Sequence, residues 1–126
     1  GCCFGPVLIK DGQINEKVNS MAGTRNSRSA IGQRSDGTML FVCIDGRQAG
    51  SMGAVFSDLL ALLQDLGAVN ACALDGGAST VLAYKDTGGL YGKAGQNIIC
   101  SSYSLFQASP RRMPTFFMVR PPEQED

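Results

Sequence analysis

The sequence predicts an α+β domain in which a mixed β-sheet with hairpins is packed by one main amphipathic helix. Three observations lead to this prediction. Apolar runs of strand length recur along the chain, two of them lie next to Asp-Gly turns, and a single segment has helical periodicity. A chain of 126 residues has the length of one domain and buries roughly two-thirds of its unfolded surface. We therefore expect residues 1–126 to form a single domain.

Two hairpins are predicted in the first part of the chain. Residues 6–14 contain a tight Asp-Gly turn at 11–12, and residues 28–45 contain a second one at 36–37. The run 39–44 in the second arm is apolar throughout, which is typical of a central strand covered on both faces. We expect this run to lie in the middle of the sheet.

The one helix is predicted at about residues 54–66, where apolar side chains form a wide face and polar ones occupy the other. Gly67 ends it, as glycine commonly does. A buried strand is expected at 69–74, with 81–84 as its hairpin partner. Residues 85–113 are rich in small and polar residues and long enough for a functional or mobile loop. A final strand is expected at 115–119.

Composition excludes several classes of function. Lys plus Arg and Asp plus Glu each number 11, so no net field favours nucleic acid or an anionic membrane. No run approaches 18 apolar residues, which argues against membrane insertion. The chain has no histidine, so catalysis has to use carboxylates, arginines, hydroxyls or cysteines. The five cysteines are odd in number and form no Cys-x-x-Cys pair, which argues against a full disulfide framework.

Two acidic residues, Asp45 and Asp75, are the candidates for chemistry. The other acids lie in hairpin turns, polar loops, the helix surface or the C-terminal tail. Each candidate follows an apolar run and precedes a glycine. If the two runs are parallel neighbours joined by the helix, both carboxylates emerge at one edge of the sheet as a paired site. The alternative, that each only caps a turn, is equally compatible with the residues.

The loop at residues 73–80 and three arginines predict an anion site. Adjacent glycines, here Gly76 and Gly77, allow a ligand to approach backbone N–H groups closely. Ser79 and Thr80 supply hydroxyls but have no histidine to activate them as nucleophiles. Arginine suits bidentate binding of phosphate or carboxylate. The arginines nearest to glycine loops or strand ends are Arg28, Arg47 and Arg112.

Six blocks of sequence, in order, resemble the C-terminal part of the phosphodiester glycosidase family. They lie at residues 5–12, 26–32, 42–47, 66–68, 74–80 and 112–119, so the resemblance spans most of 5–119. Two departures stand out. Ala78 replaces the third glycine of the family's Asp-Gly-Gly-Gly-Ser loop, where a methyl group would narrow the site or alter its backbone angles. The family's upstream Asn-Gly-rich segment has no counterpart in these residues, so we expect residues 1–126 to be the C-terminal part of a longer phosphodiester glycosidase-like domain, inactive as isolated if that segment supplies strands or site residues.

The resemblance implies hydrolysis of a sugar-1-phosphodiester at the glycosidic C–O bond. In that reaction a carboxylate supports an oxocarbenium-like centre or activates water, with Asp75 as first choice and Asp45 as second. The three arginines and the N–H groups of residues 76–79 would stabilise the phosphate. By resemblance, Asn97 contacts sugar hydroxyls. No cofactor is implied. Two carboxylates without further ligands do not make a divalent-cation site, because such cations need more oxygen ligands.

The resemblance also implies a location in the cell envelope or outside the cell, and a small-molecule or glycan phosphodiester as substrate. Two other functions remain open from the residues. The first is a non-catalytic glycan- or phosphate-binding module of a bacterial cell-envelope protein. The second is a structural domain in which Asp45 and Asp75 form a hydrogen-bonded cluster with Arg28 and Arg47. Oligomeric state is not indicated by the sequence.

Overall fold

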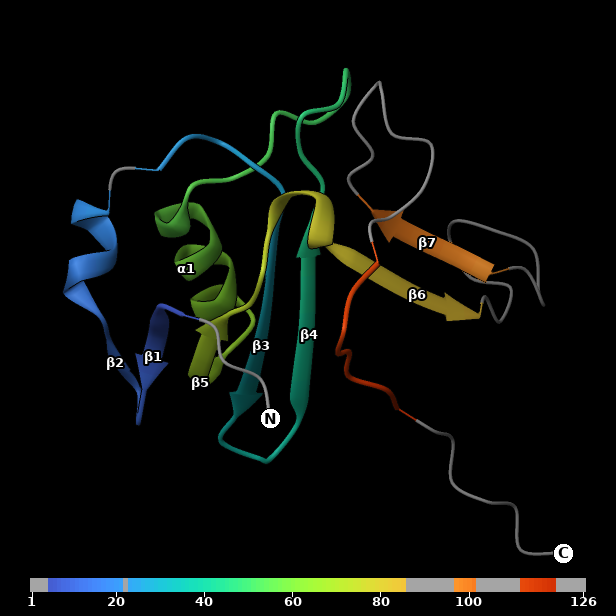
Figure 1. Cartoon of the computed structure of the whole chain (residues 1–126). Coiled ribbons are helices and arrows are strands. Elements are labelled where there is room, and N and C mark those ends of the chain that lie inside the picture. The colour runs from blue at the N-terminus through green and yellow to red at the C-terminus, as the bar shows by residue number, and fades with distance from the viewer. Residues whose placement is uncertain (1–4, 22, 86–96, 102–111, 120–126) are drawn as a thin grey trace, which may run out of the picture.

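A computed structural model describes residues 5–21, 23–85, 97–101 and 112–119 of the chain. Its main body is a five-stranded sheet with the order β2-β1-β5-β3-β4, covered on one face by the helix α1 (Figure 1). A separate two-stranded sheet, β6-β7, lies beyond β4. The α+β class with one packed helix is therefore confirmed. The elements are β1 (Val7–Lys10), β2 (Gln13–Ile14), η1 (Glu16–Ser20), β3 (Arg28–Arg34), β4 (Met39–Ile44), α1 (Phe56–Asp65), β5 (Ala68–Ala73), η2 (Gly77–Ser79), β6 (Val81–Lys85) and β7 (Asn97–Ser101).

Both predicted hairpins are present. The first turns through Asp11 and Gly12, whose φ angles of 51° and 76° are those that the right-handed twist of a two-residue hairpin requires. In the second, β3 and β4 pair from Arg28 opposite Ile44 to Gln33 opposite Met39. Every recorded pairing in the five-stranded sheet is antiparallel, where we expected a mixed sheet. The reason is that β5 pairs with β1 and β3 rather than with β4.

The helix forms where its apolar periodicity predicted it. At its start, the Asp58 carboxylate accepts a hydrogen bond of 3.2 Å from the N–H of Val55 and forms an ion pair of 2.9 Å with Arg25. Gly67, with φ of 78°, follows its end. No helix within the described ranges is long and apolar enough to cross a bilayer.

The core lies between α1 and one face of the sheet. Leu59, Leu60 and Leu63 of the helix are buried against small side chains of β3 and β5. A Cβ built on Gly32 would lie 3.2 Å from Leu63, so the absence of a side chain there lets the helix approach the sheet. Because side chains alternate along a strand, the residues between these small ones face the opposite side of the sheet.

Two expectations about pairing are wrong. Strand β4 lies at the sheet edge rather than at its centre, and its outward-facing Phe41 packs near Phe117, with ring centroids 6.1 Å apart. Its apolar character thus has two sources: Leu40, Val42 and Ile44 pack against the core, and Phe41 contacts a later chain segment. The strand at 81–85 pairs with β7, because η2 turns the chain away from the main sheet after β5.

Residues 115–119 form no strand. The segment crosses the face of the sheet, where strand edges are out of reach, and Pro114 lacks the N–H that a ladder would use. Of the long loop expected at 85–113, residues 97–101 form β7, and residues 86–96 and 102–111 lie outside the described part of the chain.

Candidate functional site

The two candidate carboxylates emerge at the same edge of the main sheet. Strands β4 and β5 both run antiparallel to β3 and lie on either side of it. Their C-terminal ends therefore flank the start of β3; Asp45 follows directly after β4, and Asp75 lies two residues after the end of β5. The sequence predicted this common edge from direct pairing of the two strands. The edge is as predicted, but β3 separates the strands.

The backbone of Asn26 and Ser27, just before β3, passes between the loops that follow β4 and β5. A Cβ built on Gly46 would overlap the Ser27 nitrogen, and one on Gly76 would lie 2.8 Å from the Ser27 oxygen. Asn26 also forms a β-bridge with Ala54, with N–H···O distances of 3.2 and 2.9 Å. The glycine after each candidate carboxylate is thus required for close packing on one segment.

The turn η2 after Asp75 uses most of its polar backbone internally. Gly77, with φ of 61°, donates its N–H to the Ser27 oxygen at 3.0 Å, and its own oxygen accepts from the Ser27 hydroxyl at 3.1 Å. The N–H groups of Ser79 and Thr80 donate to oxygens within the turn, at 3.2 and 3.0 Å. These three N–H groups therefore have partners within the protein. Ala78 is exposed and has no positive φ, so its methyl group fits this backbone.

Two buried hydroxyls in the same turn have no hydrogen-bond partner within the described part of the chain. Ser79 is 7% exposed and Thr80 is fully buried. Burying a hydroxyl without a partner costs about 1–3 kcal/mol in proteins, so such groups call for an explanation. Ser79 lines a pocket and Thr80 lies outside its lining. The two hydroxyls therefore differ in whether a ligand in the pocket can reach them.

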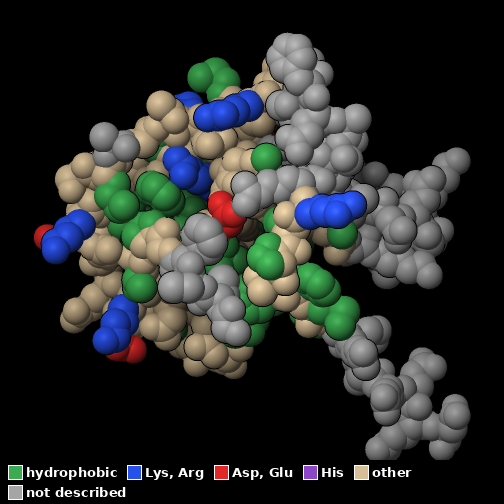
Figure 2. Space-filling view, in the orientation of Figure 1, with side chains coloured by type: hydrophobic (Ala, Val, Ile, Leu, Met, Phe, Trp, Pro, Cys, Tyr) green, Lys and Arg blue, Asp and Glu red, His purple; other side chains and the backbone are tan. Residues whose placement is uncertain are grey.

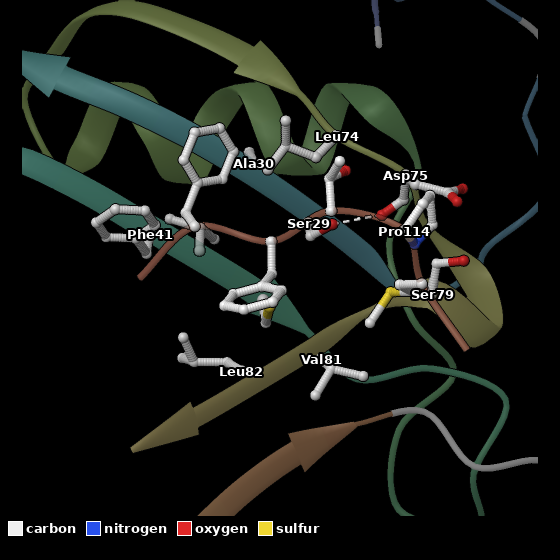
Figure 3. A pocket seen from close by; sticks show the side chains of 15 residues that line it. Ser29, Ala30, Phe41, Leu74, Asp75, Ser79, Val81, Leu82 and Pro114 are labelled. Atoms are coloured by element: carbon white, nitrogen blue, oxygen red, sulfur yellow. Dashed lines mark hydrogen bonds between the residues drawn. The ribbon is translucent and has the colours of Figure 1, made fainter. Parts of the chain in front are cut away.

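The pocket has a volume of about 480 Å³ and lies against the sheet face opposite α1. Figure 3 shows Ser29, Asp75, Ser79 and Pro114 at one end, with Phe41 towards the other. The Ser29 hydroxyl donates to the backbone oxygen of Asp75 and holds the turn against β3. In Figure 2, Lys and Arg side chains lie around an acidic side chain near the centre of the visible face, with hydrophobic side chains beside it.

The Arg28 side chain stabilises the local structure in addition to carrying a positive charge. Its guanidinium donates to the oxygens of Ala54 and Thr24, both at 3.0 Å, and stacks over the Phe56 ring at 4.1 Å from the centroid. Partial burial lowers the pKa of Arg28 from its usual value. The guanidinium still carries its positive charge at physiological pH. Because both acceptors are neutral carbonyls, the hydrogen bonds orient the cation and leave its charge in place.

The other three residues predicted to bind substrate, Arg47, Arg112 and Asn97, lie at different distances from the pocket. Arg47 is exposed, two residues after Asp45, with φ of 56°, a left-handed conformation uncommon for residues with a side chain. Arg112 is exposed and lies two residues before Pro114, within about 7 Å of it along the chain. Asn97 pairs with Lys85, the last residue of β6. Val81, the first residue of β6, follows η2 and lies four residues away, so the Asn97 backbone is about 13 Å from that end of the strand.

Asp45 acts electrostatically on the strand it follows. Burial and, as the smaller cause, the negative charge of Asp45 together raise the pKa of the Cys43 thiol to about 11. No group of three or more potential metal ligands occurs within the described residues.

Sequence reasoning missed three residues that build the site: Asn26, Ser27 and Ser29. They belong to a polar segment in which the residue pattern singled out only the arginine. A usable signal was present, since a glycine directly after each of two carboxylates suggests that another backbone passes close by.

The fold and site define a small α+β domain with a carboxylate-lined pocket beside a glycine turn. The profile of the phosphodiester glycosidase family matches residues 2–120. The chain belongs to this family, which confirms the resemblance found in its sequence blocks.

Relatives of the chain are longer proteins. The SPbeta prophage-derived uncharacterized protein YomE of Bacillus subtilis (strain 168) is 39% identical over 83 residues, covering 64% of this chain and 13% of that protein. A hypothetical protein from Synechocystis of known crystal structure is 32% identical with a TM-score of 0.52, over 75% of this chain and 19% of that one.

The catalytic domain of zebrafish N-acetylglucosamine-1-phosphodiester alpha-N-acetylglucosaminidase, auto-inhibited by its pro-peptide, is 20% identical with a TM-score of 0.49. That match covers 77% of this chain and 40% of the zebrafish chain. The chain thus spans less than half the length of each of these three proteins.

Proposed function

We propose that the protein hydrolyses a sugar-1-phosphodiester, with cleavage of the bond between the anomeric carbon and the phosphate oxygen. Water supplies the new oxygen on the sugar, and a phosphomonoester leaves. The observation that carries this proposal is the emergence of Asp45 and Asp75 at one sheet edge, with Asp75 lining a pocket beside the Ser79 hydroxyl, which has no hydrogen-bond partner among the described residues. Family membership supports the reaction class.

The chemistry needs charge stabilisation more than proton transfer. A phosphate leaving group is a weak base and departs with little acid assistance, while positive charge builds up on the sugar ring. In this proposal the Asp75 carboxylate stabilises that positive charge or orients the water, and Asp45 acts as the second carboxylate. The separation of the two carboxylates would determine whether the anomeric configuration is retained or inverted.

The phosphate is proposed to be held by hydroxyl and guanidinium groups. Ser79 offers a donor that has no partner within the described residues, in contrast to the N–H groups of the turn. Arg112 lies close to Pro114 at the polar end of the pocket, and Arg28, the first residue of β3, contributes a fixed positive charge at the edge of the sheet where both carboxylates emerge. A hydrogen bond to a charged group is worth about 1.5–3 kcal/mol, so these contacts suffice to favour the departing phosphate.

The test is release of free sugar from a panel of sugar-1-phosphodiesters by the chain and its variants. Asp75→Asn should lower kcat by about 10²- to 10⁴-fold, because a positioned acid or base contributes roughly that factor. Asp65→Asn, on the exposed helix surface, is the matched control and should stay within about twofold. Saturable binding of a diester without release of sugar would instead favour the non-catalytic binding module.

A further inference from the structure

The pocket is chemically asymmetric along its length. Ser29, Asp75 and Ser79 lie at one end of it beside Pro114, and Phe41 and Leu82 lie towards the other end, where no labelled side chain is polar (Figure 3). The apolar group comprises Phe41, Val81, Leu82, Phe116 and Phe117, here called the apolar wall. Such a combination of a large apolar surface with a few converging polar groups is typical of small-molecule sites.

The apolar wall is not part of the core between helix and sheet. Phe41 is 36% exposed, Phe117 is 49% exposed and Phe116 is 79% exposed. The core cluster is built on the other face of the sheet, from residues that contact α1. The wall therefore leaves large apolar side chains in contact with solvent, and that cost is recovered when a ligand covers them.

The opposite end of the pocket requires a polar ligand atom. The Ser79 hydroxyl is more than nine-tenths buried, lines the pocket and has no partner within the described residues. A ligand oxygen in the pocket would satisfy it and remove the penalty of an unmade hydrogen bond. The two ends together call for an occupant that is polar at one end and apolar at the other.

We propose that the substrate is a phosphodiester of an apolar alcohol, an alkyl or aryl group, which lies along the apolar wall while a phosphate oxygen accepts a hydrogen bond from Ser79. This inference rests on the proposed function. A sugar ring carries several hydroxyls that each need a partner, and the apolar wall offers them none. The sugar is therefore assigned to the solvent side of Asp75 and the alcohol to the pocket.

The kinetic test compares two substrates that share one sugar and differ only in the alcohol, a methyl and an octyl diester. We expect kcat/KM to be at least tenfold higher for the octyl diester, and the preference to disappear in Phe41→Ala. Met39→Ala is the matched control, because Met39 lies on the same strand and face outside the pocket lining and should keep the preference. Equal kcat/KM for both diesters would overturn the inference and leave the proposed function intact.

A binding test separates the inference from turnover. Calorimetry with octyl phosphate and ethyl phosphate, both below the micelle concentration of the octyl ester, should show at least tenfold tighter binding of octyl phosphate. Ser79→Ala should weaken both esters and Phe41→Ala only the octyl one. This result in the absence of hydrolysis would support the placement of an apolar ester along the apolar wall, as a ligand rather than a substrate, and would overturn the proposed function. Equal affinities, or a stable dimer that Phe41→Ala dissociates, would overturn the inference.

Discussion

The loops that follow β4 and β5 begin with the same dipeptide, Asp-Gly, yet they have different structures. After Asp75 the chain forms the compact turn η2 and buries two hydroxyls. After Asp45 it forms a longer loop whose residues 47–50 are exposed, closed by a bridge between Gln48 and Ser51. The Ser51 hydroxyl donates to the Asp45 backbone oxygen at 2.7 Å and fixes the start of that loop.

The two loops show that the glycine serves packing, whereas the residues after it determine whether a ligand can bind. In both loops the glycine is required because the loop lies against the backbone of Ser27. The residues beyond the glycine decide whether a pocket forms: small residues with hydroxyls after Asp75, exposed polar ones after Asp45. An Asp-Gly pair after an apolar run is therefore evidence of a close approach between segments, and only the residues after it indicate ligand binding.

The largest effect should come from breaking the shared packing. Gly46→Ala would place a methyl group against the Ser27 nitrogen and the Gly53 Cα, where only backbone could move to relieve it. We expect a loss of about 3 kcal/mol or more in the free energy of unfolding, measured with urea. Gly50→Ala in the same loop has open space and should change it by less than about 0.5 kcal/mol. Similar losses in the two variants would refute the packing argument.

Arg28 and Arg47, the arginines near the two loops, should contribute differently: Arg28 to the stability of the fold and Arg47 to the binding of phosphate esters. Arg28→Ala removes two hydrogen bonds to backbone oxygens and the contact with Phe56, so we expect a loss of about 2 kcal/mol in unfolding free energy. Arg47→Asn keeps a side chain that tolerates the left-handed backbone and removes the charge.

The Arg47→Asn variant should unfold within about 0.5 kcal/mol of the parent while binding phosphate esters more weakly. Parallel urea titrations and calorimetry of both arginine variants measure the contrast. Destabilisation by Arg47→Asn as large as that by Arg28→Ala would show that both cations are structural.

Conservative substitution should distinguish the roles of the Ser79 and Thr80 hydroxyls, which have no hydrogen-bond partner in the part of the chain that the structure describes. Thr80→Val keeps the volume and removes the buried hydroxyl, so we expect stability to rise by about 1 kcal/mol with ligand binding unchanged. Ser79→Ala should also leave the fold intact but weaken binding of phosphate esters. Thermal unfolding with and without octyl phosphate distinguishes the two. A destabilised Thr80→Val variant would indicate that its hydroxyl has a partner.

The smallest effect concerns Cys43, on the strand that leads to Asp45. Its pKa of about 11, raised by burial and then by the Asp45 charge, keeps the thiol protonated at pH 9 in the folded protein. The unfolded thiol, with an ordinary pKa near 9, loses its proton first, so this group favours unfolding as pH rises from about 9 to 11.

Alkylation followed by peptide mapping measures the reactivity of this one thiol, since thiolate is the reactive form. Cys43 should react slowly below pH 10 in the folded chain, and Asp45→Asn should shift its reactivity profile to slightly lower pH. An unchanged profile would show that the Asp45 charge does not reach the thiol.

Local features of the fold were predictable from the sequence, and pairing partners were not. The turns at 11–12 and 36–37 and the helix depend on neighbouring residues, and they formed where predicted. The position of β4 at the edge could not be predicted, because one face of its apolar run packs on the core while Phe41 on the other face contacts the distant Phe117. An apolar run indicates burial but does not tell which segment provides it.

The candidate site shows the same limit. Asp45 and Asp75 were found because a polar residue at the end of an apolar run is visible in the sequence, and their common edge followed from topology. The carbonyl partners of Arg28 lie at Thr24 and Ala54, and the second of these is 26 residues away. Such partners are fixed only by the three-dimensional fold, so the sequence could suggest the cation but not its structural task.

The passage of Ser27 between two later loops also has a consequence for folding. Its hydroxyl bonds to Gly77, 50 residues further along the chain, and its backbone contacts Gly46 and Gly76 from opposite sides. Contacts of such long sequence separation form late, after the chain has lost the entropy of closing large loops. Ligand binding should therefore appear during refolding only in the last step, together with the complete sheet, and no partly folded intermediate should bind.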